Sequence, residues 1–125
     1  KTYSNFNGLV IEGTGLGHMP INKIDKFTKE NELIFNELSR LSKKIPVVMT
    51  TQTLFGNVNM NVYSTGRKLL GAGVLGNYSD MLPETAFIKL AWLLSNYKKE
   101  QIKELMNKNL HGEINEKITG KEFLE

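Results

Sequence analysis

Two short apolar runs stand at either end of a longer amphipathic segment in the first half of the chain. Residues 8–12 and residues 46–50 are apolar at every position except the last. Continuous apolar character, rather than alternation of apolar and polar positions, is typical of parallel strands that are covered on both faces. We therefore predict two parallel strands that belong to one sheet.

The segment between the two runs predicts a crossover helix. One stripe of mostly apolar residues runs along this segment, and its positions recur every three or four residues, as one face of a helix requires. The series is Ile24, Phe27, Asn31, Ile34, Leu38 and Leu41. Asn22, with Asp25 three residues later, predicts an N-terminal cap, although Thr28 or Lys29 offers a second start, so the pattern leaves a break near that point open. Residues 43–46 end the helix with two lysines, an isoleucine and a proline.

The second half of the chain predicts three more helices. The first covers residues 63–71 and leaves through the glycine-rich segment 71–76. The second starts at Pro83 and Glu84, because proline fits the first helical turn and a carboxylate complements the helix dipole there. Its core-facing residues are predicted to be Ala86, Phe87, Leu90, Ala91 and Leu94. The third covers residues 99–109. Its apolar side consists of Ile102, Leu105 and Met106.

This order of elements predicts an α/β fold of three layers, in which a small parallel sheet is flanked by helices. Sheets commonly have about four to six strands, so two are too few. We expect residues 74–75 to supply a short strand and a further strand to come from the N-terminal side. The chain opens on Lys1, and we interpret residues 1–125 as a single domain from a longer polypeptide. An edge left open by the missing strand is expected to self-associate.

Composition narrows the chemistry that this domain can carry. None of the 125 residues is cysteine, which excludes a thiolate nucleophile, an iron–sulfur cluster and a cysteine zinc site. The net charge of +3 comes from lysines spread along the helices. Only Arg40 and Arg67 offer the guanidinium group that reads phosphate and guanine best, so autonomous nucleic-acid binding is not expected. No apolar run approaches the roughly 20 residues that span a bilayer, and residues 1–5 lack the apolar core of a signal peptide, so a cytoplasmic protein without a membrane partner is expected.

A glycine-rich turn follows the first predicted strand, where open α/β sheets bind ligands. The dinucleotide fingerprint G-x-G-x-x-G is not met, because counting from Gly13 ends at His18 and counting from Gly15 ends at Pro20. The turn is therefore interpreted either as a tight turn that needs glycine or as a turn that also forms part of a substrate pocket. A stand-alone flavodoxin-like nucleotide-binding module remains the less favoured alternative.

Two polar loops and a few isolated residues complete the candidate chemistry. Residues 50–53 follow the second strand with hydroxyls and an amide, and residues 57–67 are dense in both groups, which suits either ligand binding or a solvated connection. His18 and His111 are the only histidines and lie far apart in sequence, so no metal site is predicted. Trp92 is predicted to pack within its helix.

Taken in order, these motifs resemble the C-terminal domain of the asparaginase/glutaminase amidohydrolases. The stretches that carry the resemblance are residues 8–20, 46–52, 63–67, 72–74, 82–84, 88–90 and 112–114. Within that family, residues 59–67 and 80–84 are most similar to the archaeal amidotransferases that act on glutamyl-tRNA. The resemblance implies a flavodoxin-like smaller domain that follows a larger catalytic domain.

The resemblance also implies how the work is divided between the two domains. The family's catalytic threonines lie in the N-terminal domain, in T-G-G-T and T-D-T motifs that this chain lacks, so no catalytic residue is expected here. The C-terminal domain supplies a dimer contact and residues close to the substrate's amino end. The positions expected beside the substrate are Gly17, His18, Gln52, Asn61 and Tyr63.

Several functions stay open from the sequence. The first is a non-catalytic domain of an ammonia-releasing glutaminase, whose partners would be its own N-terminal asparaginase domain, a homodimer partner, an amidotransferase partner subunit and tRNA, with no cofactor. The second is the corresponding domain of an L-asparaginase. The nucleotide-binding module and a purely structural dimerisation domain are the alternatives from other classes.

Overall fold

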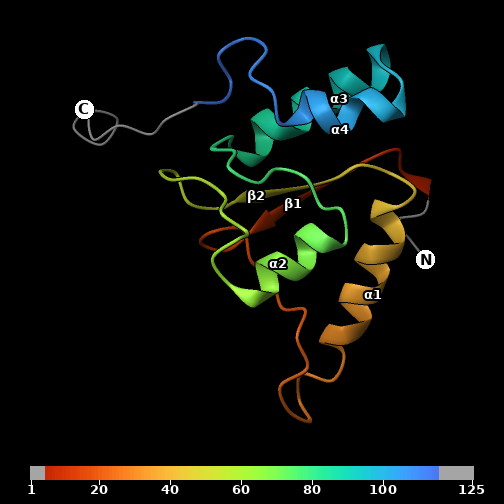
Figure 1. The fold of residues 1–125 in the computed structure, drawn as a ribbon, viewed down its shortest axis with the longest axis vertical. Coiled ribbons are helices and arrows are strands. Elements are labelled where there is room, and N and C mark those ends of the chain that lie inside the picture. Colours follow the sequence, from red (N-terminus) through yellow and green to blue (C-terminus); the bar gives the residue numbers. More distant parts are fainter. Residues whose placement is uncertain (1–4, 116–125) are drawn as a thin grey trace.

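The computed structural model describes residues 5–115 as three layers, with helices on both faces of a small parallel sheet (Figure 1). The elements in order are β1 (Leu9–Gly13), α1 (Asn31–Ser42), β2 (Val47–Thr51), α2 (Ser64–Gly71), α3 (Pro83–Asn96) and α4 (Lys99–Met106). In Figure 1, α3 and α4 lie above the strands, whereas α1 and α2 lie below them. The predicted three-layer α/β class is confirmed.

The two strands pair in parallel, with Leu9 opposite Val47 and Gly13 opposite Thr51. On the other side of β2, Leu75 forms a single parallel bridge: its N–H donates to the Val47 carbonyl at 2.8 Å, and its carbonyl accepts from Met49 at 2.9 Å. The short strand expected at residues 74–75 is therefore reduced to one bridge. Within residues 5–115, β1 forms the edge of the sheet, and the further strand and self-association there stay predictions.

Strand β2 divides the core into two clusters because its side chains alternate between the faces of the sheet. Val47 and Met49 point into the lower cluster and Val48 points into the upper one, each of them fully buried. The lower cluster is completed by Ile21, Leu38, Leu41, Val58, Met60, Leu69 and Val74. The upper cluster is completed by Met81, Ala86, Leu90, Leu93, Ile102, Met106 and Ile114. One strand thus joins the two helical layers.

The crossover helix begins later than either predicted start. The Asp25 carboxylate accepts the N–H groups of Phe27 and Thr28 at 2.9 and 3.0 Å, and the Thr28 hydroxyl accepts those of Ile24 and Asp25 at 2.8 and 2.9 Å. These bonds fold a non-helical turn in place of the first helical turns. The prediction that Ile24 and Phe27 continue the buried stripe is wrong, since each is 83% exposed.

Helix α3 carries apolar residues on its outer face as well as on its core face. Ala86 and Leu90 are buried as predicted, but Phe87 is 61% exposed and Ala91 is also exposed, so those two assignments are wrong. The outer face carries Ile88 as well. Large apolar side chains exposed on the outer face of a helix are typical of a helix that is covered in a larger assembly.

Helix α4 ends three residues before the predicted residue 109, at Met106. Asn107 follows as the C-terminal cap, and its side-chain carbonyl accepts the N–H of Gly76 at 3.1 Å. This contact links the end of α4 to the segment that bridges β2. The polar side chain that caps α4 is therefore used in a tertiary hydrogen bond.

An ion pair between a buried lysine and a partly buried glutamate holds the segment after α4 against α3. The Lys89 ammonium lies 2.6 Å from the Glu113 carboxylate and also donates to the Lys108 carbonyl at 2.6 Å. The same carboxylate accepts the N–H groups of Leu110 and His111. Burial would raise the pKa of Glu113, but the hydrogen bonds from Lys89 and from the backbone outweigh it and lower the pKa to about 2.

We predict that Glu113→Gln destabilises the chain by about 3 kcal/mol, because the buried ammonium of Lys89 would lose its counter-charge. Denaturant unfolding at neutral pH measures the change. Glu104→Gln, at an exposed position on α4, is the control and should change the unfolding free energy by less than about 0.5 kcal/mol. Equal losses in the two variants would contradict the assigned role of the pair.

The same variant tests the pH dependence. Because the pKa of Glu113 falls from its ordinary value of 4.5 to about 2 in the fold, the carboxylate stabilises the native state fully above pH 4.5. That contribution is lost as the pH falls towards 2. Unfolding curves recorded across this range should converge for the wild type and Glu113→Gln.

Candidate functional site

Three polar segments meet at the carboxyl ends of the strands. The turn after β1 and the segment after β2 are joined by the N–H of Gln52, which donates to the Gly13 carbonyl at 2.9 Å, and by the Thr51 hydroxyl, which donates to the Gly15 carbonyl at 2.5 Å. The loop before α2 is joined to the turn by the N–H of Asn59, which donates to the Leu16 carbonyl at 3.0 Å. The structure thus brings the three predicted polar segments to one edge.

The glycine turn is a closed loop that projects His18. The backbones of Thr14 and His18 pair in antiparallel fashion, with both N–H···O distances at 2.9 Å. Gly15 and Gly17 have φ of 50° and 89°, in the left-handed region that favours glycine. A Cβ atom on Gly17 would lie 2.7 Å from a Val58 methyl group, so the turn packs directly on the loop before α2.

The imidazole of His18 lies between the turn and the start of α2. Its Nδ1 is 3.4 Å from the Thr65 hydroxyl, and its ring meets the edge of Tyr63 with centroids 5.1 Å apart. Its Nε2 is buried and has no hydrogen-bond partner in the described part of the chain. A buried polar atom left without a partner costs about 1–3 kcal/mol, so this nitrogen is the group that the fold leaves unsatisfied.

Asn61 stands beside this cluster with its backbone and side chain both held. The Asn61 carbonyl and the Val62 carbonyl accept hydrogen bonds from one guanidinium nitrogen of Arg67, each at 2.9 Å. The side-chain amide nitrogen of Asn61 donates to the Tyr78 hydroxyl at 2.6 Å. The residue is exposed nevertheless, so its amide is both fixed and accessible.

The predicted site residues do not all belong to one group of contacting side chains. Gly17, His18 and Tyr63 form one contact group, and Asn61 lies two residues before Tyr63 with its side chain on Tyr78. Gln52 reaches the same edge through its backbone, and its side chain is exposed.

Sequence reasoning did not single out Tyr78, and it marked Thr65 only as a member of the polar segment 57–67. Their roles come from tertiary contacts with residues 17 and 47 positions away, for which the local pattern has no signal.

The geometry of these side chains does not suit the activation of a nucleophile. The Thr65 hydroxyl lies 3.4 Å from the His18 ring, beyond the roughly 2.6–3.2 Å expected of a nucleophile and its base, and no third group orients Nε2. Across residues 5–115, no three His, Asp or Glu side chains gather to hold a metal ion. Helix α1 begins only at Asn31, so it does not open at the glycine turn as a nucleotide-binding helix would.

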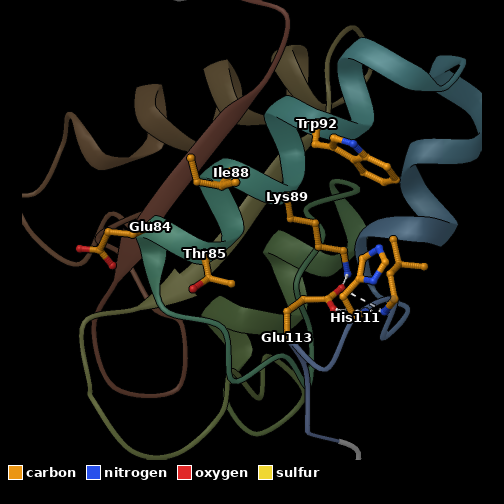
Figure 2. A pocket seen from close by; sticks show the side chains of 8 residues that line it. Glu84, Thr85, Ile88, Lys89, Trp92, His111 and Glu113 are labelled. Atoms are coloured by element: carbon orange, nitrogen blue, oxygen red, sulfur yellow. Dashed lines mark hydrogen bonds and ion pairs between the residues drawn. The ribbon is translucent and has the colours of Figure 1, made fainter.

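A second surface feature is an apolar groove of about 570 Å³ between α3 and the segment after α4 (Figure 2). It is lined by Glu84, Thr85, Ile88, Lys89, Trp92, Leu110, His111 and Glu113. Trp92, predicted to pack, is 43% exposed and meets the rings of Tyr97 and His111 edge-on at 5.5 and 6.4 Å. Lys89 and Glu113, joined by their ion pair, both line the groove (Figure 2).

The helices within residues 5–115 include none that combines the length and the apolar character needed to cross a membrane.

The chain is similar to known proteins in sequence. Residues 2–106 match the family model of the Glutaminase/Asparaginase C-terminal domain. The chain is 49% identical over 120 residues to the D subunit of the glutamyl-tRNA(Gln) amidotransferase of Methanobrevibacter smithii, an alignment that covers 95% of this chain and 25% of that protein. It is 46% identical over 110 residues to the corresponding protein of Pyrococcus abyssi, covering 87% and 23%. The chain thus spans about 25% of the length of such curated relatives.

Solved structures give the same result for the fold. The L-asparaginase from Thermococcus kodakarensis superposes with a TM-score of 0.74 at 35% identity, over 89% of this chain and 31% of that one. L-asparaginase I from Vibrio cholerae superposes with a TM-score of 0.73 at 35% identity, over 90% and 31%. The two-strand sheet with its four helices therefore has the architecture of the matching parts of these enzymes.

We predict that Gly17→Ala destabilises the chain by about 2–3 kcal/mol, because it forces alanine into the left-handed region and drives its Cβ into Val58. Gly15→Ala is the matched control, since that site also has positive φ but its Cβ would meet nothing within 4 Å. It should cost about 1 kcal/mol. Denaturant unfolding of both variants measures the difference, and equal losses would show that the turn does not depend on close packing at Gly17.

Proposed function

The chain belongs to the glutaminase/asparaginase C-terminal domain family, and we propose that it is the non-catalytic C-terminal part of an amidohydrolase that releases ammonia from glutamine for tRNA-dependent glutamine synthesis. Support comes from the similarity to amidotransferase subunits over nearly the whole chain. The polar edge at the carboxyl ends of β1 and β2 would form one wall of the substrate site.

One observation carries this assignment of the edge: the unpartnered, buried Nε2 of His18. Buried polar atoms are almost always hydrogen-bonded, so an atom left unpaired in this domain is expected to meet its partner when the parent enzyme assembles. The neighbouring amide of Asn61 and the ring of Tyr63 extend the same wall. These groups bind and orient an amino acid and do not attack it.

The chemistry itself would take place outside this chain. A threonine hydroxyl of the catalytic domain attacks the side-chain amide carbon of glutamine, and the C–N bond breaks to release ammonia. Water then cleaves the acyl-threonine ester, which gives glutamate and restores the hydroxyl. In the amidotransferase the ammonia passes to an activated glutamyl-tRNA on a partner subunit.

Exposed apolar residues around the polar edge support the presence of a covering partner. They are Leu54, Phe55, Val62, Tyr63 and Tyr78, with exposed fractions between 49% and 75%. Several large apolar side chains exposed on segments that flank one polar edge are typical of an interaction site. We propose that the catalytic domain, from the same polypeptide or from a homodimer partner, covers this edge and completes the site.

An L-asparaginase is the second candidate for the parent enzyme. The specific observation in its favour is the superposition on two solved L-asparaginases. Glutamine and asparagine carry the same ammonium and carboxylate groups at the end that this wall would contact, so the wall serves either substrate.

Measurements of ammonia release test whether the catalytic residues lie outside this chain. The chain alone should release none from glutamine or asparagine, whereas the full-length parent enzyme should release it. Measurable release by the purified chain would overturn the proposal. Saturable binding of a flavin or dinucleotide by the chain would favour a nucleotide-binding module instead.

We predict that His18→Ala in the full-length parent enzyme raises KM by about tenfold and lowers kcat by less than about twofold, because it removes a binding contact rather than a reacting group. Initial rates of ammonia release measure both constants. His111→Ala is the matched control, since that histidine is exposed beside Trp92 and should leave both constants unchanged. An unchanged KM in His18→Ala would show that His18 is a structural residue of the turn and does not contact the substrate.

A further inference from the structure

We propose that the outer face of helix α3 is an interaction surface for a second copy of this chain, which packs its own α3 there in antiparallel orientation. The core side of α3 is buried through Ala86, Leu90 and Leu93, so the outer face points away from the sheet. The polar edge lies elsewhere, at the carboxyl ends of the strands. The inference therefore goes beyond the proposed function and does not rest on it.

The outer face of α3 exposes large apolar side chains. Its midline is formed by four residues at helical spacing, which are Glu84, Ile88, Ala91 and Ser95. Phe87 and Trp92 flank this midline, one on each side. Ile88 is 65% exposed, Phe87 61% and Trp92 43%. Apolar side chains gathered on one exposed helix face are typical of an interaction site.

The polar side chains at the C-terminal end of this face are already satisfied. The Ser95 hydroxyl donates to the Ala91 carbonyl at 2.9 Å, and the Asn96 amide donates to the Trp92 carbonyl at 2.7 Å. Both hydrogen bonds lie within α3 and do not need water. Burial of the face by a partner therefore leaves neither side chain without a hydrogen bond, which keeps the cost of covering it low.

The shape of the face is complementary to itself. Ile88 projects from the midline, whereas Ala91 and Ser95, about one and two turns further on, are small. Ile88 and Ser95 lie at nearly equal distances from Ala91, in opposite directions along the helix. A two-fold axis at Ala91 thus places Ile88 of each copy over the small residues of the other. Use of the same patch by both partners is the requirement of a two-fold interface.

Apolar grooves along both sides of α3 complete the shape of the surface. One groove, of about 570 Å³, is lined by Ile88 and Trp92 among others (Figure 2). The other, of about 350 Å³, is lined by Phe87 and Ala91 together with residues of β1. Helices pack by placing the side-chain ridges of one into the grooves of the other. The ridge and the grooves needed for such packing are therefore both present on α3.

The charges at the two ends of α3 favour a second copy in antiparallel orientation. Of the two charged residues of α3, Lys89 is buried in its ion pair, and Glu84 is exposed in the first turn. Lys98 and Lys99, both exposed, follow the end of the helix. Neither Glu84 nor Lys98 forms an ion pair within residues 5–115. Antiparallel packing brings Glu84 of each copy close to Lys98 of the other, whereas parallel packing would bring like charges together.

Sedimentation equilibrium of the chain tests the proposal. The wild type should be dimeric at about 100 µM, and Ile88→Glu should raise the dissociation constant about a hundredfold or more, because it buries a charge at the centre of the interface. Leu33→Glu is the matched control, since Leu33 on α1 is 66% exposed and Ile88 is 65% exposed. It should leave the dissociation constant unchanged. Circular dichroism and the unfolding midpoint check that both variants are folded.

Two outcomes of this measurement overturn the proposal. The first is a wild-type chain that stays monomeric. The second is a dimer that persists in Ile88→Glu, which would assign self-association to another surface, such as the open edge of β1.

Charge reversal tests the antiparallel orientation. Glu84→Lys and Lys98→Glu each place like charges together at both ends of the interface, so each variant should associate about tenfold more weakly than the wild type. A mixture of the two variants should form heterodimers with the wild-type affinity, because both ends then pair opposite charges. Glu104→Lys, at an exposed position on α4, is the control and should not change the affinity. A mixture that associates no better than its separate components overturns the proposal.

A single introduced cysteine tests the position of the axis, since the chain has no cysteine of its own. Ala91→Cys should form a disulfide-linked dimer with oxidised glutathione, because the two copies of residue 91 meet at the axis within disulfide distance. Leu33→Cys, on the control surface, should remain largely monomeric. Equal yields of linked dimer from the two variants would show that the links arise from random collision, and would overturn the proposal.

Discussion

Everything in this domain depends on a single strand that is buried from end to end. All five residues of β2 are buried, so each of its side chains must be accommodated by the helical layer on its own side of the sheet. Val47 and Met49 pack against the layer of α1 and α2, and Val48 packs against the layer of α3 and α4. The pairing of β1 and Leu75 on its two sides then sets where the connecting loops emerge. The polar edge exists because those loops leave the sheet side by side.

This dependence explains which parts of the structure the sequence predicts. The strands, the three layers and the starts of α2, α3 and α4 follow from local patterns, and the polar residues gathered at the carboxyl ends follow from strand direction. The late start of α1 was not predictable from apolar spacing, because Asp25 and Thr28 use their side chains to satisfy the backbone in a different turn. The exposure of Phe87 on α3 was missed because periodicity does not show which of two apolar faces meets the core. The partnership of Asn61 with Tyr78 joins distant segments and has no local signature.

In the polar edge, the hydrogen bonding of the backbone differs from that of the side chains. Its backbone groups form hydrogen bonds with one another, which link the turn, the loop before α2 and the Tyr78 segment. Among its side chains, the Nε2 of His18 is buried without a hydrogen-bond partner in the described part of the chain. Because the backbone hydrogen bonds of the edge are made within the edge itself, the surface keeps one geometry before a ligand binds. Preorganisation of that kind lowers the entropy that binding must offset.

The ion pair between Lys89 and Glu113 has a consequence for how the molecule opens. It joins the middle of α3 to a point beyond α4, so the intervening chain, including the whole of α4, forms a closed ring held by a non-covalent crosslink. While the pair is intact, any opening of α4 must take place within that ring, where the chain has less conformational entropy to gain. The last turn of α3, α4 and the segment up to residue 113 are therefore expected to behave as one cooperative unit in native-state hydrogen exchange, rather than fraying residue by residue from the C-terminal side.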